Sequence, residues 1–210
     1  MKDWDQITEA LRARAQLMHE SREAGLALTR QMIQTASKCI RHVHRHQFDE
    51  ARVLLAKAHE TSEKARAALR AHPELYYAGY LHDAEKEVVE AAAVISIVLE
   101  TPLQKPEELG VGIMSYLNGM GEAASEVRRF AVDEMRAGRL DSATRILGNM
   151  EAIYYELITF DFPDSMTGGL RRTCDALRAV IERTRSDLHA TASQHQLVEE
   201  LRLTREALKG

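Results

Sequence analysis

Apolar residues recur at helical spacing along almost the whole chain, and proline or glycine interrupts them at few places. From residue 3 to about 46 there is no proline and one glycine, Gly25, so the pattern predicts one very long helix. Residues 190–210 keep the helical pattern and are expected to form a tail with a tendency to fray. Five more helices are predicted between these segments, over about 48–71, 74–100, 111–136, 140–159 and from 170 to at least 189, with residues 160–169 as the clearest loop.

No alternating apolar run of useful length lies between turn residues, so no strand is predicted. The expected fold class is all-α, with a single domain of about six to seven long antiparallel helices over residues 1–189 and the tail over 190–210. Helices of this length carry more apolar surface than one subunit can bury. We therefore expect the chain to form an oligomer.

Composition and charge narrow the classes of function. The 28 basic and 32 acidic side chains give a net charge of −4. This charge argues against a protein that coats nucleic acid through its overall charge, so any contact with RNA must come from local basic patches. Cys39 and Cys174 form no metal-binding or disulfide pattern and are expected to be buried. The longest apolar run, residues 91–99, is too short to span a membrane, and no signal peptide is evident. A cytoplasmic location without membrane association is expected.

Acidic residues line one face of two predicted helices, beside residues suited to a core. Asp83, Glu87 and Glu90 follow i, i+4, i+7 spacing, and Glu122 and Glu126 are four residues apart among glycines and alanines. Carboxylates gathered at an apolar interface repel one another unless a cation lies between them. Small residues on the second helix would allow the two helices to approach closely.

Two interpretations of these carboxylates remain open. Charged helix residues usually form a solvated face, which is the expected state of Asp83, Glu85 and Lys86. Glu90 and Glu122 fit that interpretation poorly, because mostly apolar or small residues surround them. Oxygen ligands alone suit Mg²⁺ or Mn²⁺, and such a site could hydrolyse a phosphate ester.

Basic and aromatic residues supply further candidates. His42 and His46 are four residues apart and could bind a metal, although a polar surface near RNA phosphates is favoured. Tyr76, Tyr77 and Tyr80 could stack on bases or belong to the core or an interface. The candidate phosphate contacts are Arg41, Arg45, Arg128, Arg129, Arg171 and Arg172. For Arg171 and Arg172 the alternative is solvation or ion pairing between subunits.

Four motifs in this order resemble the translin/TRAX family, on the TRAX side, over about residues 20–188. They are Ile40-Arg-His-Val-His44 with the preceding Thr29-Arg30, Glu87-Val-Val-Glu90-Ala, Tyr116-Leu-Asn-Gly-Met-Gly-Glu122-Ala-Ala-Ser-Glu126, and Gly169-Leu-Arg-Arg172-Thr-Cys-Asp175. Two positions depart from the family pattern. Glu122 stands where the family has aspartate, and Thr173-Cys174 replaces the residues, including a tyrosine, that precede the aspartate at position 175.

The resemblance implies an all-α subunit in a hollow oligomer, suspected to be an octamer. It also implies an Mg²⁺-dependent endoribonuclease acting on single-stranded or short RNA inside that assembly. The implied catalytic carboxylates are Glu87, Glu90 and Glu122, with Glu126 as an additional metal ligand. The alternative is a translin-like protein that binds RNA or single-stranded DNA without cleaving it. Two classes of unrelated all-α metalloenzyme are disfavoured. Ferritin-like di-iron bundles need a glutamate with a histidine three residues later, and no glutamate here has one. All-α nucleotide pyrophosphohydrolases use paired acidic helices, but Ser125 rather than an acidic residue follows three residues after Glu122.

Overall fold

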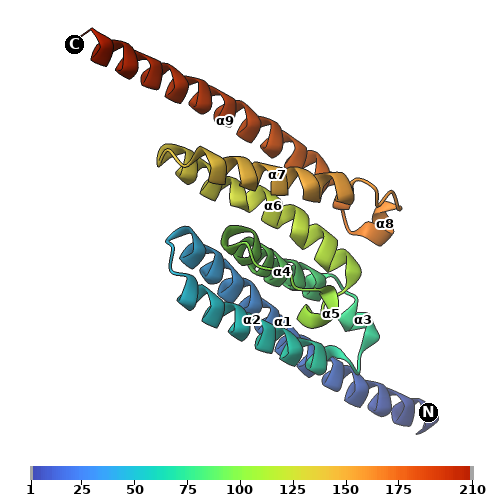
Figure 1. Ribbon diagram of the computed structural model, residues 1–210. Helices are drawn as coiled ribbons and strands as arrows, with labels where there is room; N and C mark the ends of the chain where they lie inside the picture. Colours follow the sequence, from blue (N-terminus) through green and yellow to red (C-terminus); the bar gives the residue numbers. More distant parts are fainter. Residues whose placement is uncertain (1, 209–210) are drawn as a thin grey trace. The chain divides into compact units, whose positions relative to one another are not determined.

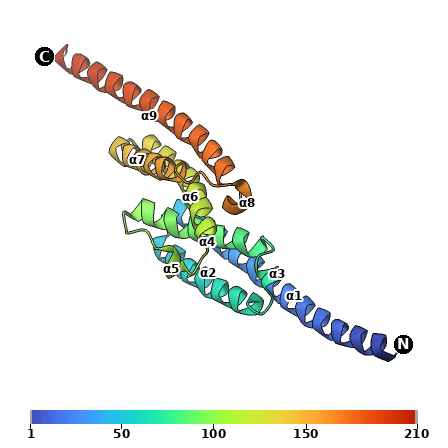
Figure 2. The same cartoon turned by 90° about the vertical axis from the view of Figure 1, so that its right-hand side faces the viewer.

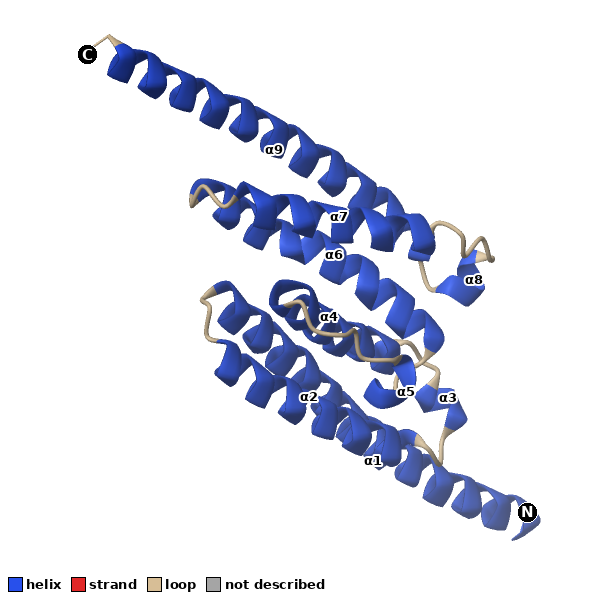
Figure 3. Cartoon of the chain, in the orientation of Figure 1, coloured by secondary structure: helices blue, strands red, loops and turns tan. Residues whose placement is uncertain are grey.

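The computed structural model describes residues 2–208, and within that range it contains helices, turns and short loops but no strand (Figure 1, Figure 3). The predicted all-α class is confirmed. In the described range the long helices are α1 (Lys2–His44), α2 (Phe48–Leu69), α4 (Tyr80–Leu99), α6 (Ile113–Arg136), α7 (Leu140–Leu157) and α9 (Leu170–Ala207). The single-turn helices are α3 (Pro73–Tyr76), α5 (Pro106–Leu109) and α8 (Asp164–Thr167). No helix of this described part has the length and hydropathy needed to cross a bilayer.

The chain divides into two compact units. Unit 1 comprises the residues up to Ala92 together with Gln104–Gly119, and unit 2 comprises Ala93–Leu103 and the residues from Met120 onward. The helices α4 and α6 each contribute to both units, since the division falls within them. No linker separates the units, which agrees with the expectation of a single domain.

The helices α1 and α2 form an antiparallel hairpin that supports unit 1 (Figure 1, Figure 2). Its core is small and tightly packed. Gly25 permits this packing, because a Cβ at that position would lie 2.6 Å from Leu69 Cδ2. The fully buried Met32 and Leu69 contact Leu81 and Val88 of α4 in one cluster. This cluster fixes the first half of α4 against the hairpin, which matters because α4 carries the first acidic stretch.

The third predicted helix differs from the structure. The pattern predicts one helix over about 74–100, whereas the chain forms α3, a turn and then α4. Gly79 adopts φ +100°, a conformation that a residue with a side chain rarely takes, and its carbonyl accepts a hydrogen bond from Asp83 N. The loop predicted over 160–169 likewise contains α8, which ends at the left-handed Gly168.

In unit 2, α7 packs along α9, and the ion pair between Arg185 and Glu151 joins them at 2.6 Å. Ile146 and Met150 of α7 and Leu177 and Ile181 of α9 are buried there. The helix α9 continues without interruption to Ala207, so the helical character predicted for the tail is confirmed within the described residues.

Candidate metal and nucleic-acid site

Glu87 and Glu90 project from α4 between residues that are fully removed from solvent. Both carboxylates are half-buried, whereas Val88 and Val89 have no exposed surface. The alternation follows from helix geometry, which directs residues three apart to one face and the intervening pair to another. Two carboxylates are therefore held on one short stretch at the edge of a packed core, as the spacing predicts.

The helix α6 approaches the backbone of α4 at this stretch. A Cβ added to Gly119 would lie 2.6 Å from Val89 Cβ and 2.7 Å from the carbonyl oxygen of Lys86. Real Cβ atoms do not come this close, so only glycine permits the contact. Gly121, two residues later, plays the same part in unit 2, where a Cβ would lie 2.6 Å from Thr173 Cγ2. The expectation that small residues of this helix allow close packing is confirmed.

Glu122 and Glu126 follow on α6 and are both half-buried, beside the fully buried Ala123 and Val127. Among the described residues, Glu87, Glu90 and Glu122 are the group of acidic, cysteine or histidine side chains that could hold a metal ion, with one carboxylate oxygen from each. Such a donor set, made entirely of carboxylate oxygens, fits a hard divalent cation and does not fit a cation that prefers nitrogen or sulfur.

The two acidic residues expected to be solvated have different environments. Asp83 is exposed and lies 3.9 Å from Lys86 Nζ, as a surface ion pair. Glu85 is only 5% exposed, so the expectation of a solvated charge at this position was wrong. Its position on α4 faces the hairpin core, where its charge is compensated by partners distant in sequence.

Those partners form a buried polar cluster in unit 1. Ser115 Oγ donates a hydrogen bond of 2.8 Å to Glu85 Oε2 and lies 2.9 Å from His82 Nδ1. Arg66 Nη1 lies 3.9 Å from Glu85 Oε1 and donates to the carbonyl of Leu109 at 3.5 Å. A buried carboxylate needs such donors to offset its desolvation. No local sequence signal predicted this cluster, since Ser115 is 30 residues away in sequence.

Arg41 lies in the last turn of α1, Arg45 directly follows the helix, and both are exposed. Positive charge there complements the helix dipole, and the two guanidinium groups remain accessible to an anion. The alternative that His42 and His46 share one helix face does not hold, because α1 ends at His44. His42 is half-buried and His46 is exposed, as the favoured polar surface requires. His46 adopts φ 58°, and its ring packs edge-on against Phe48 at a centroid distance of 5.8 Å.

The adjacent arginines of α6 have different surroundings. Arg128 donates to Asp187 Oδ2 at 2.7 Å and to Thr184 Oγ1 at 2.9 Å, which ties α6 to α9 within unit 2. These contacts occupy the guanidinium group that the sequence suggested for RNA. Arg129 is exposed and is the better candidate of the two for a phosphate contact.

Arg171 and Arg172 are exposed in the first turn of α9 and border a cavity of about 860 Å³. The same cavity is lined by Asp161, Asp164 and Asp175. Three carboxylates oppose the binding of an anion there, although the two arginines can still reach one from the rim.

The candidate tyrosines and the two cysteines differ in how deeply they are buried. Tyr76 and Tyr80 are half-buried and pack against the core cluster of unit 1, whereas Tyr77 is 82% exposed. Both cysteines are buried and unpaired, as expected. Burial raises the pKa of Cys39 to about 12 and also raises the pKa of Cys174, so neither thiol is a nucleophile at neutral pH.

Known proteins resemble this chain in both sequence and fold. The chain matches the crystal structure of AfC3PO, and the structure of AfC3PO in complex with duplex RNA, at 36% identity and a TM-score of 0.83. Each match covers 89% of this chain and 97% of the other. The crystal structure of apo-NeC3PO matches in fold at 21% identity and a TM-score of 0.79, over 88% of this chain and 96% of that chain.

A further relative is recognised by its sequence. The uncharacterized protein MJ0175 of Methanocaldococcus jannaschii is 28% identical over 184 residues, which is 86% of this chain and 81% of that protein. No family model matches the chain.

Proposed function

Because the chain belongs to the C3PO family of translin/TRAX proteins, we propose that it is a metal-dependent endoribonuclease that cleaves single-stranded or short RNA. The observation that carries this proposal is the 36% identity, over nearly the whole chain, to a protein whose structure was solved with duplex RNA. The half-buried carboxylates on α4 and α6 supply the chemistry that RNA hydrolysis requires.

Glu87, Glu90 and Glu122 are the proposed ligands of Mg²⁺ or Mn²⁺, and they are the group of described residues suited to such an ion. Within unit 1, Gly119 brings α6 against α4 at the carbonyl oxygen of Lys86 and the side chain of Val89. The helix α6 continues without a break, so Glu122 follows one turn after that contact. Glu126, one further turn along α6, is proposed as an additional ligand.

A divalent cation held there would polarise the phosphoryl oxygen and lower the pKa of a bound water. The protein positions the metal ligands and limits the access of water to them. Glu87 and Glu90 are fixed on a helix whose neighbouring residues, Val88 and Val89, are fully buried. Ligands on rigid helices keep their geometry better than ligands on loops.

Exposed arginines are the proposed contacts to the RNA backbone. Arg41, Arg45 and Arg129 are accessible and carry no ion pair that would have to break first in the described structure, and Arg171 and Arg172 can contribute from the start of α9. Because the chain is net acidic, these local groups must supply the attraction.

We also infer that the chain assembles into an oligomer. Apolar side chains at both ends of the chain are largely exposed in the described monomer, including Trp4, Ile7 and Leu11 of α1 and Leu197 and Leu201 of α9. Their helical spacing forms two apolar stripes. Light scattering should give a mass well above the 23.7 kDa of one chain, and a mass equal to one chain would refute the inference.

The proposed activity is tested by following cleavage of a labelled single-stranded RNA with Mg²⁺, with Mn²⁺ and with EDTA. We expect cleavage with metal and none with EDTA. E87Q, E90Q and E122Q each should slow cleavage by about 100-fold or more, because even an outer-sphere change costs about 10- to 100-fold in metal affinity or activity. The matched control is D83N, which alters an exposed carboxylate of α4.

Two results would contradict the assignment. Full activity in E90Q and E122Q would show that the wrong carboxylates have been chosen. If the protein binds RNA but cleaves none with any divalent metal, the translin-like binding function is supported and the nuclease function is refuted.

A further inference from the structure

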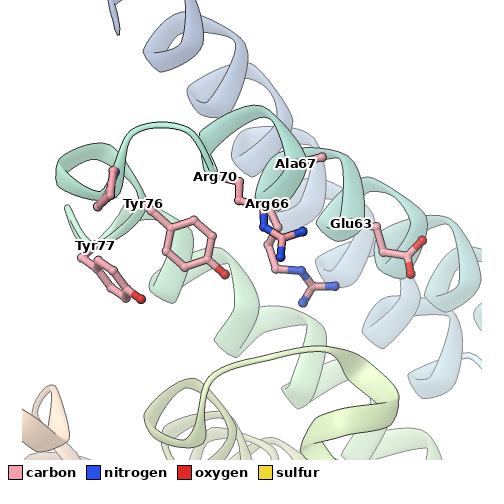
Figure 4. Close-up of a pocket in the computed structure, with 7 residues that line it drawn as sticks. Glu63, Arg66, Ala67, Arg70, Tyr76 and Tyr77 are labelled. Atoms are coloured by element: carbon pink, nitrogen blue, oxygen red, sulfur yellow. The ribbon is translucent and has the colours of Figure 1, made fainter.

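A cavity of about 500 Å³ lies in unit 1 where α2 ends and α3 begins (Figure 4). Arg66 and Arg70 of α2 and Tyr76 and Tyr77 of the α3 turn contribute the groups with binding chemistry. Ala67 and Pro73 add apolar surface, and Glu63 completes the lining. None of these residues belongs to the proposed metal site, so the cavity needs a separate explanation.

The two arginines of the cavity differ in how firmly they are held. Arg66 is 19% exposed, and its guanidinium group is fixed by the carbonyl of Leu109 and by Glu85, which also balances its charge. Arg70, one turn later on α2, is exposed. Arg66 therefore offers positioned donors, whereas Arg70 supplies positive charge. Together they suit a phosphate group, which accepts hydrogen bonds from more than one guanidinium.

The tyrosines offer an aromatic surface beside this charge. The rings of Tyr76 and Tyr77 meet edge-on, with centroids 5.1 Å apart and planes at 67°. Tyr76 packs against the core cluster, and burial, followed by the charge of Glu85, raises its pKa, so its phenol remains a neutral donor. Tyr77 is 82% exposed and has a face free of the core. In Figure 4 the Tyr76 ring stands between Tyr77 and the guanidinium groups.

We propose that this cavity binds one unpaired nucleotide of RNA, with its base stacked on Tyr77 and its phosphate held by Arg70 and Arg66. Unpaired bases are the part of RNA that can stack on tyrosine, and a base joined to its phosphate matches the aromatic and cationic halves of the cavity. Glu63 repels a second phosphate, which limits the site to one. The choice of RNA as the source of the nucleotide rests on the proposed function, whereas the cavity itself requires no metal.

The test measures binding of a labelled single-stranded RNA by fluorescence anisotropy in EDTA, where cleavage is prevented. Y77A should weaken binding roughly 5- to 150-fold, the range of one base stacked on an aromatic ring, and Y77F should bind like the wild type. R70A should weaken binding and reduce the slope of log affinity against log salt by about 0.7.

The matched controls are Y155A and R52A. Tyr155 is 58% exposed and forms a similar edge-on pair with Tyr154, at 5.6 Å, but lines no part of this cavity. Arg52 is an exposed arginine of α2 in a different cavity. Both variants should bind RNA at least half as well as the wild type.

Other RNA substrates show which nucleotide of the RNA binds in the cavity. A blunt duplex should show no loss on Y77A, whereas a duplex with an unpaired overhang should. If the bound unit is the first nucleotide, a 5′-phosphate should bind more tightly than a 5′-hydroxyl, and if it is internal the two should be equal. Unchanged binding of single-stranded RNA by both Y77A and R70A would overturn the cavity assignment and leave the proposed function intact. If the wild type binds no RNA, the proposed function fails. Calorimetry with adenosine monophosphate then tests the cavity by itself, and absence of binding would overturn its assignment as a nucleotide site.

Discussion

Replacing Gly119 by alanine tests how closely α6 must approach α4. The added Cβ would lie 2.6 Å from Val89 Cβ and 2.7 Å from the backbone oxygen of Lys86, where ordinary contacts between carbon atoms are about 3.5–4.0 Å. The helices must therefore separate by about 1 Å, because a backbone carbonyl cannot rotate away as a flexible side chain can. Overpacking of this kind costs about 1–3 kcal/mol, and the rigid backbone places Gly119 in the upper half of that range.

Alanine also favours the helix, by about 1 kcal/mol over glycine, which offsets part of the cost. The free energy of unfolding of G119A should therefore be about 1–2 kcal/mol lower than that of the wild type. The matched control is G148A on α7, where a Cβ would meet nothing within 4 Å and alanine should raise stability by about 0.5–1 kcal/mol.

Urea denaturation followed by circular dichroism measures both variants on the same scale. The two substitutions should change the midpoint in opposite directions. A G119A protein as stable as the wild type, or a shift with the same sign as that of G148A, would refute the close approach. Because Glu122 follows Gly119 by one turn, G119A should also impair metal-dependent cleavage, whereas G148A should not.

Three further substitutions test individual side-chain contacts. E85A should lower the free energy of unfolding by about 2–4 kcal/mol in urea denaturation, because it leaves Arg66 without its buried counterion and Ser115 without its acceptor. Cys39 should resist alkylation in the native state. Because its pKa is raised in the folded protein, the buried thiol contributes stability below pH 9 that is lost as the pH rises towards 12, at about 1.4 kcal/mol per pH unit. Comparing the unfolding free energies of C39A and the wild type across that pH range measures this loss. R128A should lose about 1 kcal/mol of coupling with Asp187 in a double-mutant cycle, and no coupling would refute the link.

The positions of the long helices and the choice of candidate acidic residues could be predicted from local patterns in the sequence. The long helices could be predicted because proline and glycine mark their ends, as at Pro73 and Gly138, and because the apolar period is unbroken between those marks. Glu87, Glu90 and Glu122 were recognisable because charged residues beside alanine and valine need an explanation. In both cases the deciding information lies within a few residues along the chain.

The features that could not be predicted depend on residues distant in sequence. Glu85 looks like any other charge on α4, and its burial follows from Ser115 and Arg66, which other elements bring to it. The turn before α4 depends on the left-handed backbone of Gly79, which sequence alone does not distinguish from a tolerated helical glycine. The cavity of Arg70 and Tyr77 arises where α2 stops, so its shape also required the structure.

Iron-directed cleavage shows whether the carboxylates of α4 and α6 bind a divalent metal. Fe²⁺ replaces Mg²⁺ in oxygen-ligand sites, and with ascorbate and peroxide it cuts the nearby backbone, which mass spectrometry locates. If these carboxylates hold the metal, cuts should appear beside Glu87, Glu90 and Glu122, excess Mg²⁺ should suppress them, and E90Q should abolish them. Cuts at other positions, or cuts at these positions that persist in E90Q, would contradict this assignment.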